Sequence, residues 1–99
     1  MNIGKMMKNL QQMQAKMQAE LDRLEVEASS GGGMVTAGMN GKKELTSLKL
    51  SPEAITPDDS ELLEDLIIAA VNEAGRKVDE QVAEMTQGMA GGLNIPGLT

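Results

Sequence analysis

A heptad pattern of apolar residues near the start of the chain is the strongest constraint on its fold. The stripe consists of Ile3, Met6, Leu10, Met13, Met17 and Leu24. This spacing predicts a single helix from Ile3 to Leu24, about 33 Å long. A globule of a hundred residues has a radius of gyration of only about 13 Å. Part of the helix must therefore project from the subunit or pair with another helix.

The other side of this predicted helix is basic and rich in amides. Residues 1–18 contain Lys5, Lys8 and Lys16 and no acidic residue. At about 100° per residue, these lysines fall nearly opposite the apolar stripe. The whole chain has a net charge of -6, with seven acidic residues and no basic residue between positions 52 and 75. A polyanion would therefore have to bind the local basic face.

Alternation with a period of two predicts three antiparallel strands after the helix. The first runs from about 24 to 30 and ends at the glycines 31–33. The segments 34–39 and 42–50 flank Asn40-Gly41, which is typical of a two-residue type I′ turn. Such a turn would pair Met39 with Lys42 and Ala37 with Glu44.

A second long helix is predicted to begin at Thr56-Pro57 and to run to about Gln87. Its apolar residues are dense at first and then form a narrower stripe, so we expect the first half to cover the sheet and the second to face a partner. The expected fold class is α+β, a two-layer subunit with the order α-β-β-β-α. It forms one domain over residues 1–87, followed by a flexible glycine-rich tail over 88–99.

Composition excludes several classes of function. The chain has no cysteine, histidine or aromatic residue. Disulfides, thiolate chemistry, cysteine zinc sites and base stacking on aromatic rings are therefore excluded, and the side chain best suited to proton transfer near neutral pH is missing. The acidic residues 58–65 are typical of a helix start. We expect no enzyme, no cofactor, no metal site and no small-molecule substrate.

Two further patterns have simpler interpretations than ligand binding. Gly41-Lys42 is not a P-loop, because Thr36 stands where the first glycine is needed and Lys43 where Ser or Thr is needed. The methionine stripe favours adaptable helix packing over a soft-metal site. No segment is apolar enough to span a membrane, and the start of the chain has no continuous apolar signal core, so a cytoplasmic protein is expected.

Several stretches together resemble the YbaB/EbfC family of bacterial nucleoid-associated proteins. They are residues 6–13, the run 31–35, the turn 39–44, the segments 63–67 and 69–72, and the tail 92–98. The resemblance implies a homodimer with projecting long helices, located in the nucleoid, that binds DNA with little sequence preference. It also implies DNA contacts by basic residues of the first and last helices, which here are Lys5, Lys8, Lys16, Arg76 and Lys77.

Two hypotheses for function follow from these observations. In the first, a homodimer binds duplex DNA through phosphate contacts and compacts or bridges the chromosome, affecting expression. In the second, the chain is a protein-interaction module for replication or recombination factors, and its lysines are only solvated. In the first hypothesis, helix stripes form the expected dimer interface, through Leu10, Met13, Met17, Val78 and Val82. In the second, the helix stripes and the tail bind the partner protein.

Overall fold

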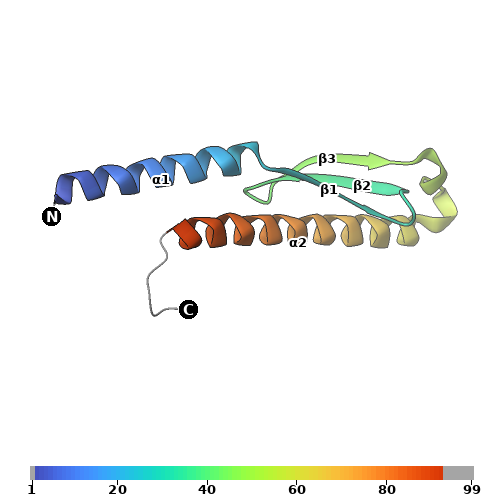
Figure 1. Cartoon of the computed structure of the whole chain (residues 1–99). Coiled ribbons are helices and arrows are strands. Elements are labelled where there is room, and N and C mark those ends of the chain that lie inside the picture. Colours follow the sequence, from blue (N-terminus) through green and yellow to red (C-terminus); the bar gives the residue numbers. More distant parts are fainter. Residues whose placement is uncertain (1, 93–99) are drawn as a thin grey trace.

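The computed structural model describes residues 2–92, with side chains described as far as Gln87. A long helix, α1 (Ile3–Arg23), precedes strands β1 (Glu25–Ser30), β2 (Val35–Asn40) and β3 (Leu45–Leu50). Two 3-10 turns, η1 (Pro52–Ala54) and η2 (Pro57–Asp59), lead into the second helix, α2 (Ser60–Gly92). The sheet is antiparallel with the order β1-β2-β3. The predicted α+β order is confirmed, with α2 as one layer and the sheet as the other (Figure 1).

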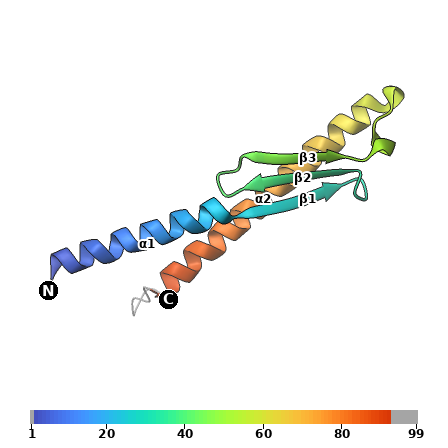
Figure 2. The same cartoon turned by 90° about the horizontal axis from the view of Figure 1, so that it is seen from above.

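The core lies between α2 and the inner face of the sheet. Its buried residues are Ala28, Val35, Ala37, Met39, Ala70, Ala74 and Val78. Many of these are alanines, and their small side chains let the helix lie close to the strands. α2 packs mainly against β1 and β2, and it runs diagonally beneath the strands (Figure 2). The sheet contact reaches Val82, so it extends beyond the dense first half of the helix that was predicted to form it.

Three consecutive glycines make the turn between β1 and β2. Gly31, Gly32 and Gly33 have φ angles of 61°, 67° and 97°. Only glycine adopts such angles without steric cost. The turn pairs Ser30 with Val35 and Ala28 with Ala37. The predicted turn at this run is confirmed.

The second hairpin differs from its prediction. Met39 pairs with Leu45 and Ala37 with Leu48, so the predicted pairs of Met39 with Lys42 and Ala37 with Glu44 are wrong. Gly41 does not have a positive φ, whereas Lys43 does, at 62°. The Asn40 side chain accepts hydrogen bonds from the backbone N–H groups of Lys42 and Glu44, both at 3.0 Å. The loop is therefore longer than a two-residue turn and is closed by Asn40.

Gly41 is required for a different reason, which is a close approach to the end of α1. A Cβ atom on Gly41 would lie 2.5 Å from the backbone oxygen of Leu21. Real Cβ atoms essentially never come so near another heavy atom. The glycine thus lets the hairpin tip lie directly against the last turn of α1, a contact that no local turn preference reveals.

A bulge in β3 decides which of its side chains face α2. The pairing shifts between Gly38 opposite Ser47 and Met39 opposite Leu45, which leaves Thr46 as the extra residue. Leu45 and Leu48 therefore both lie on the inner face, opposite Met39 and Ala37. On the outer face the Thr46 hydroxyl donates a hydrogen bond to the Glu25 carboxylate.

The second long helix begins and ends differently from its prediction. Thr56 and Pro57 open η2 rather than α2, and the Thr56 side chain makes no capping hydrogen bond. α2 begins at Ser60 and continues to Gly92, past the predicted end near Gln87. The remainder of the predicted tail, residues 93–99, lies outside the described residues.

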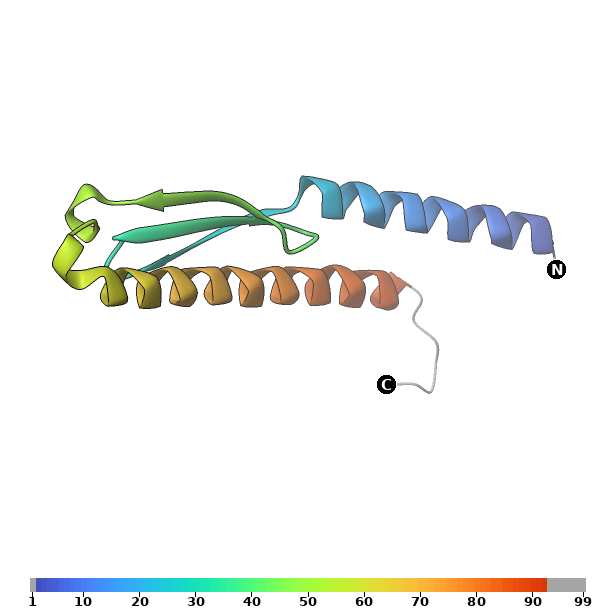
Figure 3. The same cartoon turned by 180° about the vertical axis from the view of Figure 1, so that it is seen from behind.

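α1 extends away from the rest of the subunit as an arm. It has no buried residue, and Figure 3 shows it running beyond the end of the sheet. The subunit measures 69 × 26 × 15 Å and has a radius of gyration of 19.3 Å, against about 13 Å for a compact chain of this length.

Candidate nucleic-acid interface

Three predicted DNA-contact residues lie on the arm. Lys5, Lys8 and Lys16 are all exposed on α1. Within the described part of the chain, none of the three ammonium groups forms an ion pair. The Asn2 side chain accepts a hydrogen bond from the backbone N–H of Lys5 at 3.3 Å and so caps the start of the helix. The positive end of the helix dipole then lies next to Lys5 and Lys8.

Arg23 belongs to the same face, although sequence reasoning did not include it. At about 100° per residue, Lys5, Lys16 and Arg23 fall within about 20° of one line along α1, with Lys8 about 60° to one side. The line from Lys5 to Arg23 is about 27 Å long. The helical spacing within the predicted helix is the signal that could have found Arg23. We call Lys5, Lys8, Lys16 and Arg23 the α1 row.

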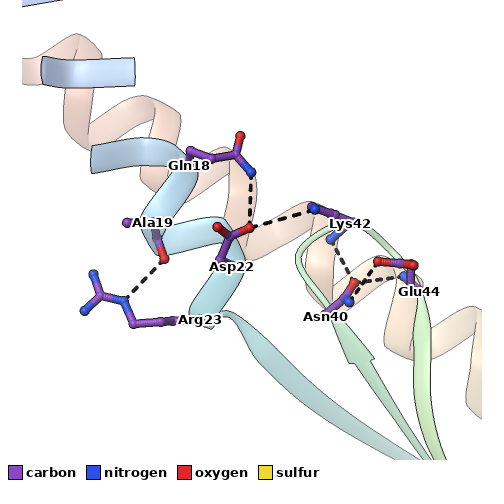
Figure 4. A network of polar contacts seen from close by, with 7 residues as sticks. All are labelled: Gln18, Ala19, Asp22, Arg23, Asn40, Lys42 and Glu44. Carbon is purple, nitrogen blue, oxygen red and sulfur yellow. Dashed lines mark hydrogen bonds and ion pairs between the residues drawn. The ribbon is translucent and has the colours of Figure 1, made fainter. Parts of the chain in front are cut away.

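The guanidinium of Arg23 does not pair with the carboxylate of its neighbour Asp22. Its Nε donates to the Ala19 backbone oxygen at 3.3 Å, and the side chain points away from Asp22 (Figure 4). Asp22 instead accepts a hydrogen bond from Gln18 at 3.1 Å and lies 4.0 Å from Lys42. Asp22 is thus directed to the hairpin tip. Glu20 lies about 40–60° from the line through Lys5, Lys16 and Arg23 and offsets one of the four positive charges of the α1 row.

The two cations predicted on the last helix are held by polar partners. Arg76 forms an ion pair with Glu73, with its Nε at 3.0 Å from the carboxylate. Lys77 donates to the Glu27 backbone oxygen on β1 at 2.7 Å. Both residues are exposed, but these partners offset part of their charge or fix their position. Their contact with DNA stays a prediction.

The hairpin cations are also paired. The Lys43 ammonium lies 3.2 Å from the Asp79 carboxylate on α2, and Lys42 faces Asp22 as described above. Both pairs are exposed, where such interactions contribute little to stability. They nevertheless lower the net positive charge at the hairpin tip.

The residues predicted for a dimer interface lie in two different environments. On the arm, Leu10 is 55% exposed, whereas Met13 and Met17 are half-buried. Val78 is only 1% exposed and belongs to the core, and Val82 packs against that core. These two valines therefore already pack within the subunit, between α2 and the sheet. The role of all five residues in a dimer stays a prediction.

The molecule carries a basic face on the arm and an acidic cluster at the turns that lead into α2. The α1 row occupies the arm, whereas η1, η2 and the first turns of α2 carry Glu53, Asp58, Asp59 and Glu61. Within residues 2–87 no three carboxylates come close enough to hold a metal ion. No helix in the described ranges is long and apolar enough to cross a bilayer. The exposed ammonium and guanidinium groups of the α1 row can bind anionic groups.

Several known proteins are similar to this chain over most of its length. The model of the YbaB/EbfC DNA-binding family matches residues 1–93. The chain is 50% identical to a nucleoid-associated protein of Alkaliphilus metalliredigens, over 98% of this chain and 88% of that protein. It is 52% identical to one of Thermoanaerobacter pseudethanolicus, over 98% and 90%. An uncharacterized protein of Helicobacter pylori has the same fold, with a TM-score of 0.74 at 22% identity over 91% of this chain and 98% of that one.

Proposed function

Because the chain belongs to the YbaB/EbfC DNA-binding family, we propose that it binds duplex DNA through the α1 row on its projecting arm. The single observation that carries this assignment is the row itself. It places four exposed cations on one face of α1 against one nearby acidic residue, Glu20, since Asp22 is turned to Lys42. Arg76 and Lys77 assist from α2 to a smaller extent, because Glu73 and the Glu27 carbonyl hold them.

The contacts go mainly to phosphates, so binding has little sequence preference. Lysine ammonium groups bind phosphate as point charges, whereas base edges are read most often by paired donors of arginine, asparagine or glutamine. The row contains one arginine, and the chain has no aromatic residue to stack on bases. Its length of about 27 Å corresponds to about eight base pairs of duplex.

The active form is a homodimer, whose two arms allow it to bridge or compact the chromosome. The subunit exposes 7272 Å² of surface, whereas a compact monomer of 10.5 kDa exposes about 5,400 Å². The excess supports a chain that buries further surface against a second copy. The names of the relatives support a location in the nucleoid of the cytoplasm and a role in binding rather than catalysis.

A salt titration of duplex binding tests the proposal. If the four cations of one copy each neutralise a phosphate, the slope of log affinity against log salt is about -3.6 per copy. The double variant Lys5→Gln with Lys8→Gln should reduce the magnitude of this slope by about 1.8 per copy. The measurement is a gel-shift or anisotropy series from low to moderate salt. A second assay asks whether the protein retains a labelled duplex on an immobilised one, as bridging requires.

Lys42→Gln with Lys43→Gln is the matched control, because it removes the same charges from ammonium groups already paired with Asp22 and Asp79. We expect a smaller change of slope for this control than for the arm variant. The mechanism is wrong if the arm variant binds DNA as tightly as the parent, with an unchanged slope. If the folded parent fails to bind duplex even at low salt, the interaction-module hypothesis is favoured instead.

A further inference from the structure

Methionine is the only readily oxidised type of residue in the chain. Cysteine, histidine, tryptophan and tyrosine are absent, whereas there are nine methionines. An oxidant that reaches the protein therefore acts on thioether sulfur. The exposure of each methionine side chain then decides which of them reacts first.

Two methionines on the arm are more accessible than the others that the structure describes. Met6 and Met7 are 50% and 56% exposed. Met39 is only 5% exposed and lies in the core. The remaining described methionines are half-buried, namely Met13, Met17, Met34 and Met85. A dissolved oxidant therefore meets the sulfur atoms at positions 6 and 7 first.

Packing against the rest of the described chain gives little support to the outer half of α1. Every side chain from Asn2 to Gln12 is exposed, and Figure 3 shows this part of the arm beyond the end of the sheet. An isolated helix shorter than about 12–15 residues is marginal in water, and Gly4 weakens the first turn further. The outer half of α1 therefore depends on interactions within the helix itself.

Apolar contacts between successive turns supply much of this support. In a helix, side chains three or four positions apart lie next to one another, and apolar pairs at these spacings stabilise it. Four such pairs occur in the first two turns, namely Ile3 with Met6, Ile3 with Met7, Met6 with Leu10 and Met7 with Leu10. Each pair contains one of the two exposed methionines, so a change at both methionines affects all four pairs.

We propose that Met6 and Met7 form an oxidation-sensitive site that controls DNA binding by the outer part of the α1 row. The oxidant is a peroxide. The thioether sulfur attacks one peroxide oxygen, so that an S–O bond forms and the O–O bond breaks. The sulfur loses two electrons, and the released hydroxide takes the proton of the new S–OH group and leaves as water. The product is methionine sulfoxide, which methionine sulfoxide reductases convert back to the thioether.

Oxidation removes the support of the turns that carry two cations of the α1 row. A sulfoxide is polar, so it no longer contributes to the apolar pairs. The first two turns of α1 then unfold, and Lys5 and Lys8 lose their fixed positions, whereas Lys16 and Arg23 lie nearer the base and keep theirs. This inference rests on the proposed function, because it concerns the regulation of the same row.

Peptide mapping after peroxide treatment identifies the oxidised residues. Cleavage after Glu20 releases the first part of the chain as one peptide, and its fragmentation in a mass spectrometer assigns each added oxygen atom. We expect positions 6 and 7 to gain oxygen before Met13 and Met17 do. If either half-buried methionine reacts as fast as the exposed pair, the assignment of the site is wrong.

The functional measurement compares the salt slope of duplex binding before and after oxidation. Loss of the contacts of Lys5 and Lys8 should reduce the magnitude of the slope by about 1.8 per copy. Circular dichroism should show the loss of about seven helical residues, which is the length of two turns. Methionine sulfoxide reductases with a thiol reductant should restore both the slope and the helix content.

Leucine variants show whether the two sulfur atoms are responsible. Met6→Leu with Met7→Leu removes the oxidisable sulfur and keeps the apolar pairs, so this variant should retain the parental slope and helix content after peroxide treatment. Met13→Leu with Met17→Leu is the matched control on the same helix and should remain as sensitive as the parent. The inference is wrong if peroxide lowers the slope of the first variant as much as that of the parent.

The outcomes distinguish this inference from the proposed function. Peptide mapping and circular dichroism need no DNA, so they test the site and the unfolding of the outer turns by themselves. If the parent binds duplex with the expected slope and keeps that slope after Met6 and Met7 are oxidised, the proposed function stands and the inference is wrong. If the unoxidised parent does not bind duplex, both the proposed function and the control of DNA binding are wrong.

Discussion

Replacing Gly41 with alanine should destabilise the subunit by wedging the hairpin away from the arm. The added Cβ would lie 2.5 Å from the Leu21 oxygen and 3.2 Å from the Leu21 Cα. Both neighbours are main-chain atoms of α1, so no side-chain rotation relieves the overlap. Overpacking of this kind costs about 1–3 kcal/mol. Because Gly41 does not have a positive φ, the lower conformational entropy of the unfolded alanine variant offsets about 0.4–1 kcal/mol of that.

The expected net loss in the free energy of unfolding is thus about 1–2 kcal/mol. Urea denaturation at a fixed protein concentration measures it, since any dimer makes stability depend on concentration. Gly75→Ala is the matched control. Its Cβ would meet only the Lys43 side chain, at 3.5 Å, and alanine inside a helix should add about 1 kcal/mol. If Gly41→Ala is as stable as the parent, the close approach to Leu21 is not a constraint.

Three further substitutions test other contacts. Val35→Ala, at a side chain with no exposed surface, should cost about 2 kcal/mol by leaving a cavity; a loss well below 1 kcal/mol by urea titration would mean that the alanine-rich core collapses around it. Lys77→Met should lower the free energy of unfolding by about 1 kcal/mol, because the Glu27 carbonyl loses its donor. Its duplex affinity, measured by anisotropy, should fall far less than that of Lys16→Met. Equal falls would contradict the smaller role proposed for Lys77 in DNA binding. Arg23→Ala should reduce the magnitude of the salt slope by about 0.9 per copy, and an unchanged slope would remove Arg23 from the α1 row.

Much of the fold follows from local patterns in the sequence. The heptad stripe predicts a helix from Ile3 to Leu24, and α1 ends one residue earlier, at Arg23. The glycine run predicts the first turn because three consecutive positive φ angles require glycine. The order of strands follows because short turns join neighbouring antiparallel strands. These features depend on residues close together in the chain.

The predictions that are wrong or incomplete concern contacts between segments that are far apart in the sequence. Asn40-Gly41 has the composition of a two-residue turn, but Gly41 lies against Leu21 without a positive φ, and the pairing with β2 starts at Leu45 rather than Lys42. Periodicity alone did not show that Val78 would be buried in the core or that Leu45 and Leu48 would remain exposed. The partners of Arg76 and Lys77 were likewise invisible, since Glu27 is fifty residues away from Lys77 in sequence.

Because α1 is attached to the rest of the subunit at its Arg23 end, a small rotation there moves the other end of the helix by a larger distance. The helix is about 31 Å long from its base at Arg23 to Ile3, and it has no buried residue along that length. A rotation of about 10° near Leu24 moves the far end by about 5 Å, while Arg23 hardly moves. In the proposed complex with DNA, adjustment to grooves of different width would therefore occur mainly at Lys5 and Lys8, while Arg23 keeps its position.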